Sequence, residues 1–530
     1  MSLSIFAAAS PTPVSVPGAN IFTSAFILSI AIWTPVLVAV LIGLMPNPRG
    51  RYDTLIKQIA FFTNLGILFV LFIAYNQFSN FLPSVQYEEN RPWLPAIGVT
   101  YHLGVDGPGI LMLMLSALIG IISVLASIGI RTRVRAYFAL LLLAQASVTG
   151  AIAAHDLFVL VLFWTASIIP IALLVLGWGG PRREAGAWRL VGYWGAGSIA
   201  LILAATAIYA SAGATSFDMD VVLKSPASTR VEVIAGLALV IAAATRLPLF
   251  PLHGWVRDVY AEAPIGVIVV IAGSATRLGG YMLIRVLIAG EPDGAKLLAP
   301  LIAAIAALTV AYGAIAALRA ADVRHAAANL ALIPGGVTAM GLAALTPLSL
   351  AGAVLSLFAG GMAAALIVSV MTVVSERGQT RSLAVLSGLA SRMPKLAWLT
   401  VLAGLGVLGV PLMGSFTSNE MTFFGSFKTQ PVGAFAVAAG LALAAIAVAV
   451  LVQRVLFGPP NPNAPAVSDS SLPETWFLGM LAGALLWVGI VPGGPKIPGT
   501  DTPLFDPGLV TQMVADIPEI SSPYGGTTTP

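Results

Sequence analysis

Charged residues and cysteine are what this 530-residue chain lacks. Only 9% of its residues are charged, whereas 58% are hydrophobic and the mean hydropathy is +0.94. A soluble globular domain has about a quarter of its residues charged. The composition therefore excludes a soluble enzyme with a single anchor and is typical of a polytopic membrane protein. The length leaves room for roughly fourteen spans of about 20 residues each.

The absence of cysteine excludes disulfides, thiolate zinc sites and cysteine-ligated iron–sulfur clusters within this chain. The four histidines show no ligand spacing, so we interpret them as loop or helix-end residues and expect no metal site. They are His102, His155, His253 and His325. A Gly-x-Gly-x-x-Gly at residues 404–409 lies in an apolar run and not after a strand, which indicates close helix packing and not a dinucleotide site. The net charge of +4 is spread over short loops and does not indicate nucleic-acid binding.

Apolar runs separated by polar, Gly and Pro clusters predict an all-α membrane protein with about fourteen transmembrane helices. The predicted spans are 22–45, 55–77, 109–130, 136–153, 157–177, 189–211, 233–251, 264–289, 297–318, 326–345, 348–374, 395–428, 431–455 and 474–492. We expect a polar leader at 1–21, a flexible tail at 493–530, and an extended surface segment in the loop 78–108.

Basic residues predict the orientation of the chain. Alternate loops on one side hold 17 of the 26 Lys and Arg residues, the other side holds 7, and Arg246 and Arg277 lie within spans. The positive-inside rule then places both termini on the outer side.

Three charged residues fall inside apolar spans: Arg246, Arg277 and Glu420. A charge at the bilayer centre costs about 2.5–3.5 kcal/mol on insertion scales. Such charges indicate either a hydrophilic path or an electrostatic element inside a helix bundle.

Two spans carry helix-breaking residues close to these charges. Pro248 and Pro251 interrupt the span after Arg246, and Pro411 and Gly414 weaken the span before Glu420. Proline kinks alone are common in membrane helices. Two interrupted helices in the two halves of a long bundle, however, suggest an internal repeat with a polar midplane.

The segment RLPLFPLHGWVRDVYAEAP, from Arg246 to Pro264, makes the sequence resemble a known family. It is similar to the antiporter-like subunit M, or chain 4, of proton-pumping NADH–quinone oxidoreductase (respiratory complex I). The matching residues are Pro248, Pro251, His253, Trp255, Asp258, Glu262, Ala263 and Pro264, whereas Arg257 stands where the family has a proline. Further stretches fit in order: LGVDG at 103–107, FW…IIP at 163–170, RLGGYMLIR at 277–285, GVP…GSF at 409–427 and FGP at 457–459.

The resemblance implies fourteen helices with two inverted five-helix repeats, here 136–289 and 297–455, after helices 1–3 at 22–130 and before a last helix at 474–492. It also implies a subunit of a proton-translocating complex in a bacterial plasma membrane or a thylakoid-type membrane. The chain would hold no cofactor and no redox centre of its own. NAD(P)H or ferredoxin, flavin, iron–sulfur clusters and quinone would belong to partner membrane-arm and peripheral subunits.

The departures from the family fall on its proton path. Thr165 stands for a glutamate, and Arg246 and Arg277 each stand for a lysine. Two family histidines align near Pro334 and Ala359, and the glutamate of the twelfth span aligns with Asn419 or, with one insertion, Glu420. A buried lysine can lose its proton, but arginine effectively cannot. The arginines can hold fixed charge, order water and repel cations, which leaves Glu420 as the one titratable candidate deep in a span.

Two mechanisms therefore compete. In one, protons still pass through water wires, with Glu420 titrating and the arginines setting the field. In the other, the channel is silent and the role is structural. A subunit of a multisubunit cation/proton antiporter without a redox partner is the alternative function. His253 could relay a proton beside the break, and Asp258 and Glu262 could serve coupling or helix capping and interface pairing.

Overall fold

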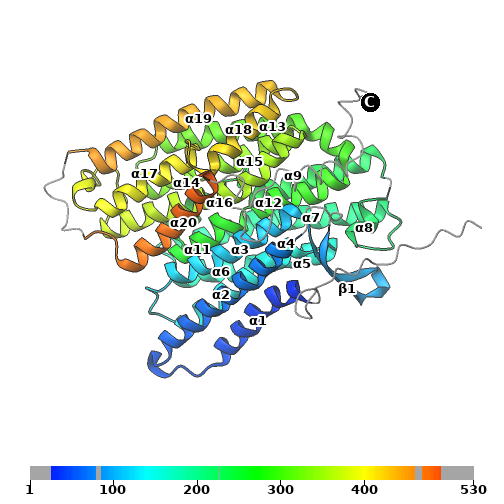
Figure 1. Ribbon diagram of the computed structural model, residues 1–530, viewed down its shortest axis with the longest axis horizontal. Coiled ribbons are helices and arrows are strands. Elements are labelled where there is room, and N and C mark those ends of the chain that lie inside the picture. Colours follow the sequence, from blue (N-terminus) through cyan, green and yellow to red (C-terminus); the bar gives the residue numbers. More distant parts are fainter. Residues whose placement is uncertain (1–25, 79–84, 226, 460–467, 491–530) are drawn as a thin grey trace, which may run out of the picture.

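The computed structural model describes residues 26–78, 85–225, 227–459 and 468–490. Within them the chain forms a bundle of long helices, with a two-stranded sheet at one end (Figure 1). The first part contains α1 (Ile27–Leu44), η1 (Pro48–Gly50), α2 (Asp53–Gln77), β1 (Gln86–Leu94), η2 (Pro95–Ile97), β2 (Val99–Val105) and α3 (Gly107–Ala126). The expected leader at 1–21 and tail at 493–530 lie outside the described residues.

The remaining elements follow the order of the two expected repeats. The first segment contains α4 (Val134–Ala153), α5 (Leu157–Ala166), α6 (Ile168–Trp178), α7 (Arg183–Ser211), α8 (Met219–Val222), α9 (Thr229–Arg246), α10 (Val256–Glu262), α11 (Ile265–Val270), η3 (Ile271–Ala275), α12 (Leu278–Met282) and η4 (Leu283–Ile288). The second contains α13 (Pro292–Leu318), α14 (Val323–Leu330), α15 (Ile333–Ala343), α16 (Pro347–Arg377), η5 (Leu389–Ser391), α17 (Pro394–Leu408), α18 (Gly414–Ser426), α19 (Pro431–Val452) and η6 (Gln453–Phe457), before α20 (Leu472–Ile490).

Twelve helical spans in the described residues are long and apolar enough to cross a membrane. The other two predicted spans are the interrupted ones, α9–α10 and α17–α18. The all-α polytopic membrane fold is therefore confirmed, and the count of fourteen spans stays a prediction.

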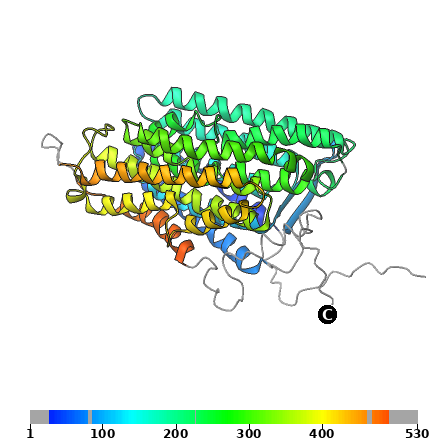
Figure 2. The same ribbon diagram turned by 90° about the horizontal axis from the view of Figure 1, so that it is seen from above.

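Two spans form the centre of the bundle. In the spans Ile265–Ile288 and Pro347–Arg377, the most apolar 18-residue window is wholly buried. The corresponding windows of α1, α2 and α19 are only 39%, 28% and 33% buried, and these helices lie at the edges of the bundle (Figure 1). Seen from above, the long helices run nearly parallel to one another (Figure 2). Because lipid solvates apolar side chains, the edge helices can expose them toward the bilayer or a neighbouring subunit.

The two five-helix segments share local features. In each segment the second helix begins at a capping aspartate: Asp156 accepts from the backbone N–H of Phe158 at 2.8 Å, and Asp322 accepts from that of Arg324 at 2.7 Å. In each segment the fourth membrane span is the interrupted one, namely α9–α10 in the first segment and α17–α18 in the second. Recurrence at matching places supports the division into two repeats, which stays a prediction.

Neighbouring groups satisfy the backbone of the first break, between Arg246 and Val256. The hydroxyl of Thr309 accepts from the Phe250 N–H at 2.9 Å, and the Trp255 indole donates to the Thr245 carbonyl at 2.9 Å. A break of this kind is tolerated in a membrane only where protein or water supplies such partners.

The second break lies between α17 and α18. Gly409 ends α17 with a positive φ of 67°, and the Asn419 amide donates to the Leu408 carbonyl at 3.1 Å. A Cβ on Gly404 or Gly406 would come within 2.5 Å of Val448 or 2.4 Å of Leu485. These glycines therefore allow close helix packing, as the sequence indicated.

The loop between α2 and α3 contains an antiparallel hairpin of β1 and β2, which confirms the predicted extended segment. The hairpin lies at the same end of the bundle as α8 (Figure 1).

Candidate functional site

Arg246, the last residue of α9, is completely buried. Its guanidinium carbon lies 3.8 Å from the ring centroid of Trp194 and 4.8 Å from that of Trp164. Its Nη2 donates to the Trp164 carbonyl at 2.5 Å and to the Ser167 hydroxyl at 2.8 Å. Two aromatic faces and two neutral acceptors thus hold this cation, and no carboxylate pairs with it in the described part of the chain.

Arg277 lies at the centre of the wholly buried span and is 1% exposed. The π-helical turns η3 and η4 flank the short helix α12 that follows it. Such turns are uncommon and are frequent at functional sites. A Cβ on Gly361 of α16 would come within 2.4 Å of the Gly273 carbonyl oxygen in η3, so this glycine lets α16 pack closely against the turn that precedes Arg277.

Several polar atoms around these arginines lack a partner among the described residues. They are Nε and Nη1 of Arg246, Nε and Nη1 of Arg277, Oγ1 of Thr165 and Nδ1 of His253. Buried polar groups are satisfied by protein or by ordered water in the great majority of cases. The interior near the first break therefore suits buried water.

Glu420 lies elsewhere. The buried face of α18 consists of small residues, namely Gly414, Ser415, Ser418, Thr422, Gly425 and Ser426. Glu420 projects from the opposite side, is exposed, and lines a groove of about 400 Å³ with Met340, Phe416 and Asn419. The expectation of a glutamate in the interior is therefore wrong. The physical reason is that the small polar residues of this helix, and not its apolar ones, pack against the bundle.

The other predicted site residues lie in or beside the first break. His253 packs against Tyr312, with 4.3 Å between ring centroids. Asp258 forms an ion pair with the exposed Arg189. Glu262, which is 5% exposed, pairs with Arg381 at 2.7 Å and so links the two five-helix segments. Its carboxylate also accepts from the backbone N–H of Arg182, at the start of α7, at 3.2 Å, so Glu262 both pairs across the segments and contacts a helix start.

Arg285, one of the seven basic residues counted on the outer side from the sequence, is a third buried arginine. Arg285 lies inside η4, is 5% exposed, and pairs with Asp106 at 3.2 Å. Its Nη1 also donates to the Tyr281 hydroxyl at 2.8 Å. It stands near the end of the predicted span 264–289, and no local signal identified its partner 179 residues away.

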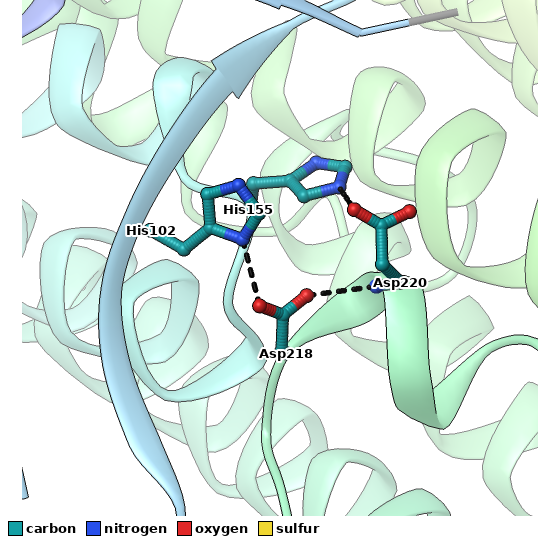
Figure 3. A group of neighbouring side chains, drawn as sticks. All are labelled: His102, His155, Asp218 and Asp220. Carbon is teal, nitrogen blue, oxygen red and sulfur yellow. Dashed lines mark hydrogen bonds and ion pairs between the residues drawn. The ribbon is translucent and has the colours of Figure 1, made fainter. Parts of the chain in front are cut away.

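Two histidines that are far apart in the sequence meet at the hairpin end of the bundle (Figure 3). The rings of His102 and His155 are 4.6 Å apart between centroids. His102 pairs with Asp218 at 2.8 Å and His155 with Asp220 at 3.0 Å. The hydrogen bond from His155 holds the pKa of the Asp220 carboxyl well below its usual range. His155 lies in the link between α4 and α5, and His102 lies in β2 of the loop before α3, so both lie outside the long helices as the sequence indicated.

A pair of carboxylates lies at the start of α13. Glu291 is 2% exposed, and Oε2 of Glu232 accepts from the backbone N–H of Asp293 and Gly294 at 3.1 and 3.0 Å. Burial, with repulsion from Glu232, raises the pKa of Glu291 to about 7.

Replacing Glu291 with Gln is expected to stabilise the protein at pH 8 and to change little at pH 5. A carboxyl whose native pKa is raised loses stability as the pH rises through the interval between its usual value and about 7,. Above that interval, the substitution is expected to raise the free energy of unfolding by about 2 kcal/mol, which is less than the full pKa shift of Glu291 would give. Thermal unfolding of the detergent-solubilised protein at both pH values measures it. Asp293→Asn, at a half-exposed neighbour, is the control, and an equal gain at pH 5 would contradict this assignment.

Comparisons with known proteins agree on one family. The family model "NADH:quinone oxidoreductase/Mrp antiporter, TM" matches residues 154–446. NAD(P)H-quinone oxidoreductase chain 4 1 of Synechococcus sp. (strain JA-2-3B'a(2-13)) is 30% identical over 444 residues, which cover 82% of this chain and 83% of that protein.

Solved structures share the fold. A chain of respiratory complex I from Thermus thermophilus with bound NADH has a TM-score of 0.80 and 24% identity, covering 93% of this chain and 99% of that one. A chain of the Mrp complex from Dietzia sp. DQ12-45-1b has a TM-score of 0.75 and 22% identity, covering 94% of this chain and 56% of that one. By its matched length and its relatives, this integral membrane protein belongs to the NADH:quinone oxidoreductase/Mrp antiporter family of membrane subunits.

Proposed function

We propose that this chain is a chain 4-type membrane-arm subunit of a proton-pumping NAD(P)H– or ferredoxin–quinone oxidoreductase. The relative from Synechococcus matches it over four fifths of both proteins. The electron donor, flavin, iron–sulfur clusters and quinone are then held by partner subunits of the membrane and peripheral arms. The antiporter alternative has weaker support, because the matched Mrp chain is covered over only 56% of its length.

Purification of the native assembly tests this proposal. We expect co-migrating subunits that carry flavin and iron–sulfur clusters, identified by mass spectrometry and by their absorption spectra. Co-migration with small antiporter subunits alone, without any redox cofactor, would overturn it.

We further propose that the interior of this subunit is an electrostatic barrier and not a proton-conducting path. The observation that carries the proposal is the enclosure of Arg246 between two tryptophans, with no carboxylate partner in the ranges that the structure describes. Arginine keeps its proton at any physiological pH. Thr165 cannot replace a titrating carboxylate, and Glu420 projects out of the bundle. The fixed charges of Arg246 and Arg277 would repel protons and other cations from any water near the break.

The proposed orientation places the hairpin end of the bundle, with α8, on the outer side of a bacterial plasma or thylakoid-type membrane. Because the chain has no cysteine, a thiol reagent labels this subunit only at an introduced cysteine, and the labelling measures the accessibility of that position. Lys224→Cys is expected to react with an impermeant thiol reagent in intact cells, whereas Lys395→Cys reacts only after the membrane is opened. The reverse pattern would invert the orientation.

A further inference from the structure

We propose that His102, His155, Asp218 and Asp220 form a binding site for a first-row divalent transition metal ion, with Zn²⁺ the best match. One ligand atom from each of the four residues lies within 4.8 Å of every other (Figure 3). This proposal does not depend on the proposed function of the complex.

The four ligand atoms favour zinc over magnesium and calcium. Two imidazole nitrogens and two carboxylate oxygens match the ligands of tetrahedral zinc, whose bonds of about 2.0–2.2 Å separate the ligand atoms by about 3.4 Å. The two histidine–aspartate contacts, of 2.8 and 3.0 Å, are somewhat shorter than this separation. The upper limit of 4.8 Å between any two of the four ligand atoms is longer than it. Two carboxylates also balance the charge of a divalent ion. Mg²⁺ and Ca²⁺ prefer sites made of oxygen alone, so the paired imidazoles disfavour them.

The backbone holds the ligands in place. The N–H of His155 donates to the His102 carbonyl at 2.9 Å, and the N–H of Met219, between the two aspartates, donates to the His155 carbonyl at 3.1 Å. The carboxylate of Asp218 caps α8 by accepting from the N–H of Asp220 at 2.9 Å. The hairpin, the α4–α5 link and the segment before α9 thus each contribute ligands through fixed backbone, which is the preorganisation a metal site requires.

The site can be reached from one side. The side chains of His102, His155 and Asp218 are 3%, 7% and 11% exposed, whereas that of Asp220 is 42% exposed. An ion would therefore enter past Asp220, from the face expected to be outside. A metal there would fasten the surface hairpin to the helix bundle.

Proton positions set the cost of binding. A metal on Nδ1 of His102 replaces the 2.8 Å hydrogen bond between Nδ1 and Asp218 and moves the ring proton to Nε2, which has no partner in the described residues. A metal on Nε2 of His155 moves its proton to Nδ1, which faces the guanidinium of Arg285. Arg285 must then turn away while keeping Asp106 and Tyr281, its partners at 3.2 and 2.8 Å. Neither step releases a proton or needs a co-reactant.

Zinc binding by the purified native assembly, stripped with a chelator, tests the site. We expect one tight Zn²⁺ per copy of this chain, with X-ray absorption showing two imidazoles at about 2.0–2.1 Å. His102→Gln and Asp220→Asn should each weaken zinc binding more than about 10-fold. This figure is the smallest loss of metal affinity that is typical when a residue supporting the metal ligands is changed. Millimolar Mg²⁺ should not compete.

His325→Gln is the matched control, since it removes a histidine that lies outside the cluster and pairs with Asp322. It should leave zinc affinity unchanged. If His102→Gln does not assemble, Asp220→Asn, at the exposed rim, still decides the question. Zinc affinity equal in wild type and Asp220→Asn, or no zinc bound by the wild type, would overturn the proposal.

Discussion

Replacing Arg246 with methionine is expected to make membranes that contain the assembled complex about 30-fold more permeable to protons through this subunit. A fixed positive charge repels a proton about 8 Å away by about 2 kcal/mol at an effective dielectric constant of 20, and 1.4 kcal/mol corresponds to a factor of ten. Methionine fills similar space without charge, so packing around Trp164 and Trp194 is kept. Removing the barrier lets protons enter any water near the break.

The leak is measured in proteoliposomes as the decay of an imposed pH gradient without electron donor. Arg257→Met is the matched control, because Arg257 is exposed at the start of α10 and should leave the decay unchanged. An unaltered decay in Arg246→Met, with the complex intact, would show that Arg246 is no barrier.

Replacing Trp194 with leucine is expected to destabilise the subunit by about 3–5 kcal/mol. A desolvated cation–π contact contributes about 2 kcal/mol, and the smaller side chain leaves a cavity in a wholly buried place. Trp194→Phe should cost much less, because it keeps an aromatic face and because the Trp194 indole nitrogen has no hydrogen-bond partner among the described residues. Retention of this subunit in the complex on native gels during heating measures the effect.

The control for this change lies on the same helix. Trp188 of α7 is 67% exposed, so Trp188→Leu should alter retention little. In the Arg246→Met background the cost of Trp194→Leu should fall by about 2 kcal/mol, since the cation is gone. An equal cost in both backgrounds would mean that the tryptophan does not hold the arginine.

The architecture followed from the sequence because a bilayer imposes length and polarity on every span. Both breaks were predicted, since proline removes a backbone donor wherever it stands. The exact helix ends depended on caps such as Asp156 and Gly409, which sequence patterns indicate less precisely.

The candidate site was predicted only in part. The burial of Arg246 and Arg277 could be foreseen from apolar neighbours in the same span. The aromatic enclosure of Arg246 could not, because Trp164 and Trp194 belong to other helices. Glu420 was misplaced because hydropathy identifies a membrane span but not which side of the helix packs inward.

The histidine–aspartate cluster was missed for a related reason. His102 and Asp218 are 116 residues apart. They meet because the α4–α5 link forms bridges both to the hairpin, through Leu103 and Ala154, and to the segment before α8, through Asp156 and Asp218. Ligand spacing along the chain detects metal sites built on one local motif, not sites built by tertiary contacts.

The number of protons moved per quinone reduced, measured at the first moment of turnover, tests the central claim most directly. Before a gradient forms a leak has no driving force, so the initial ratio reports pumping alone. If the buried arginines are fixed charges and not steps of a proton path, Arg246→Met gives the same initial ratio as wild type while the final gradient is smaller. A lower initial ratio with undiminished electron transfer would contradict the account.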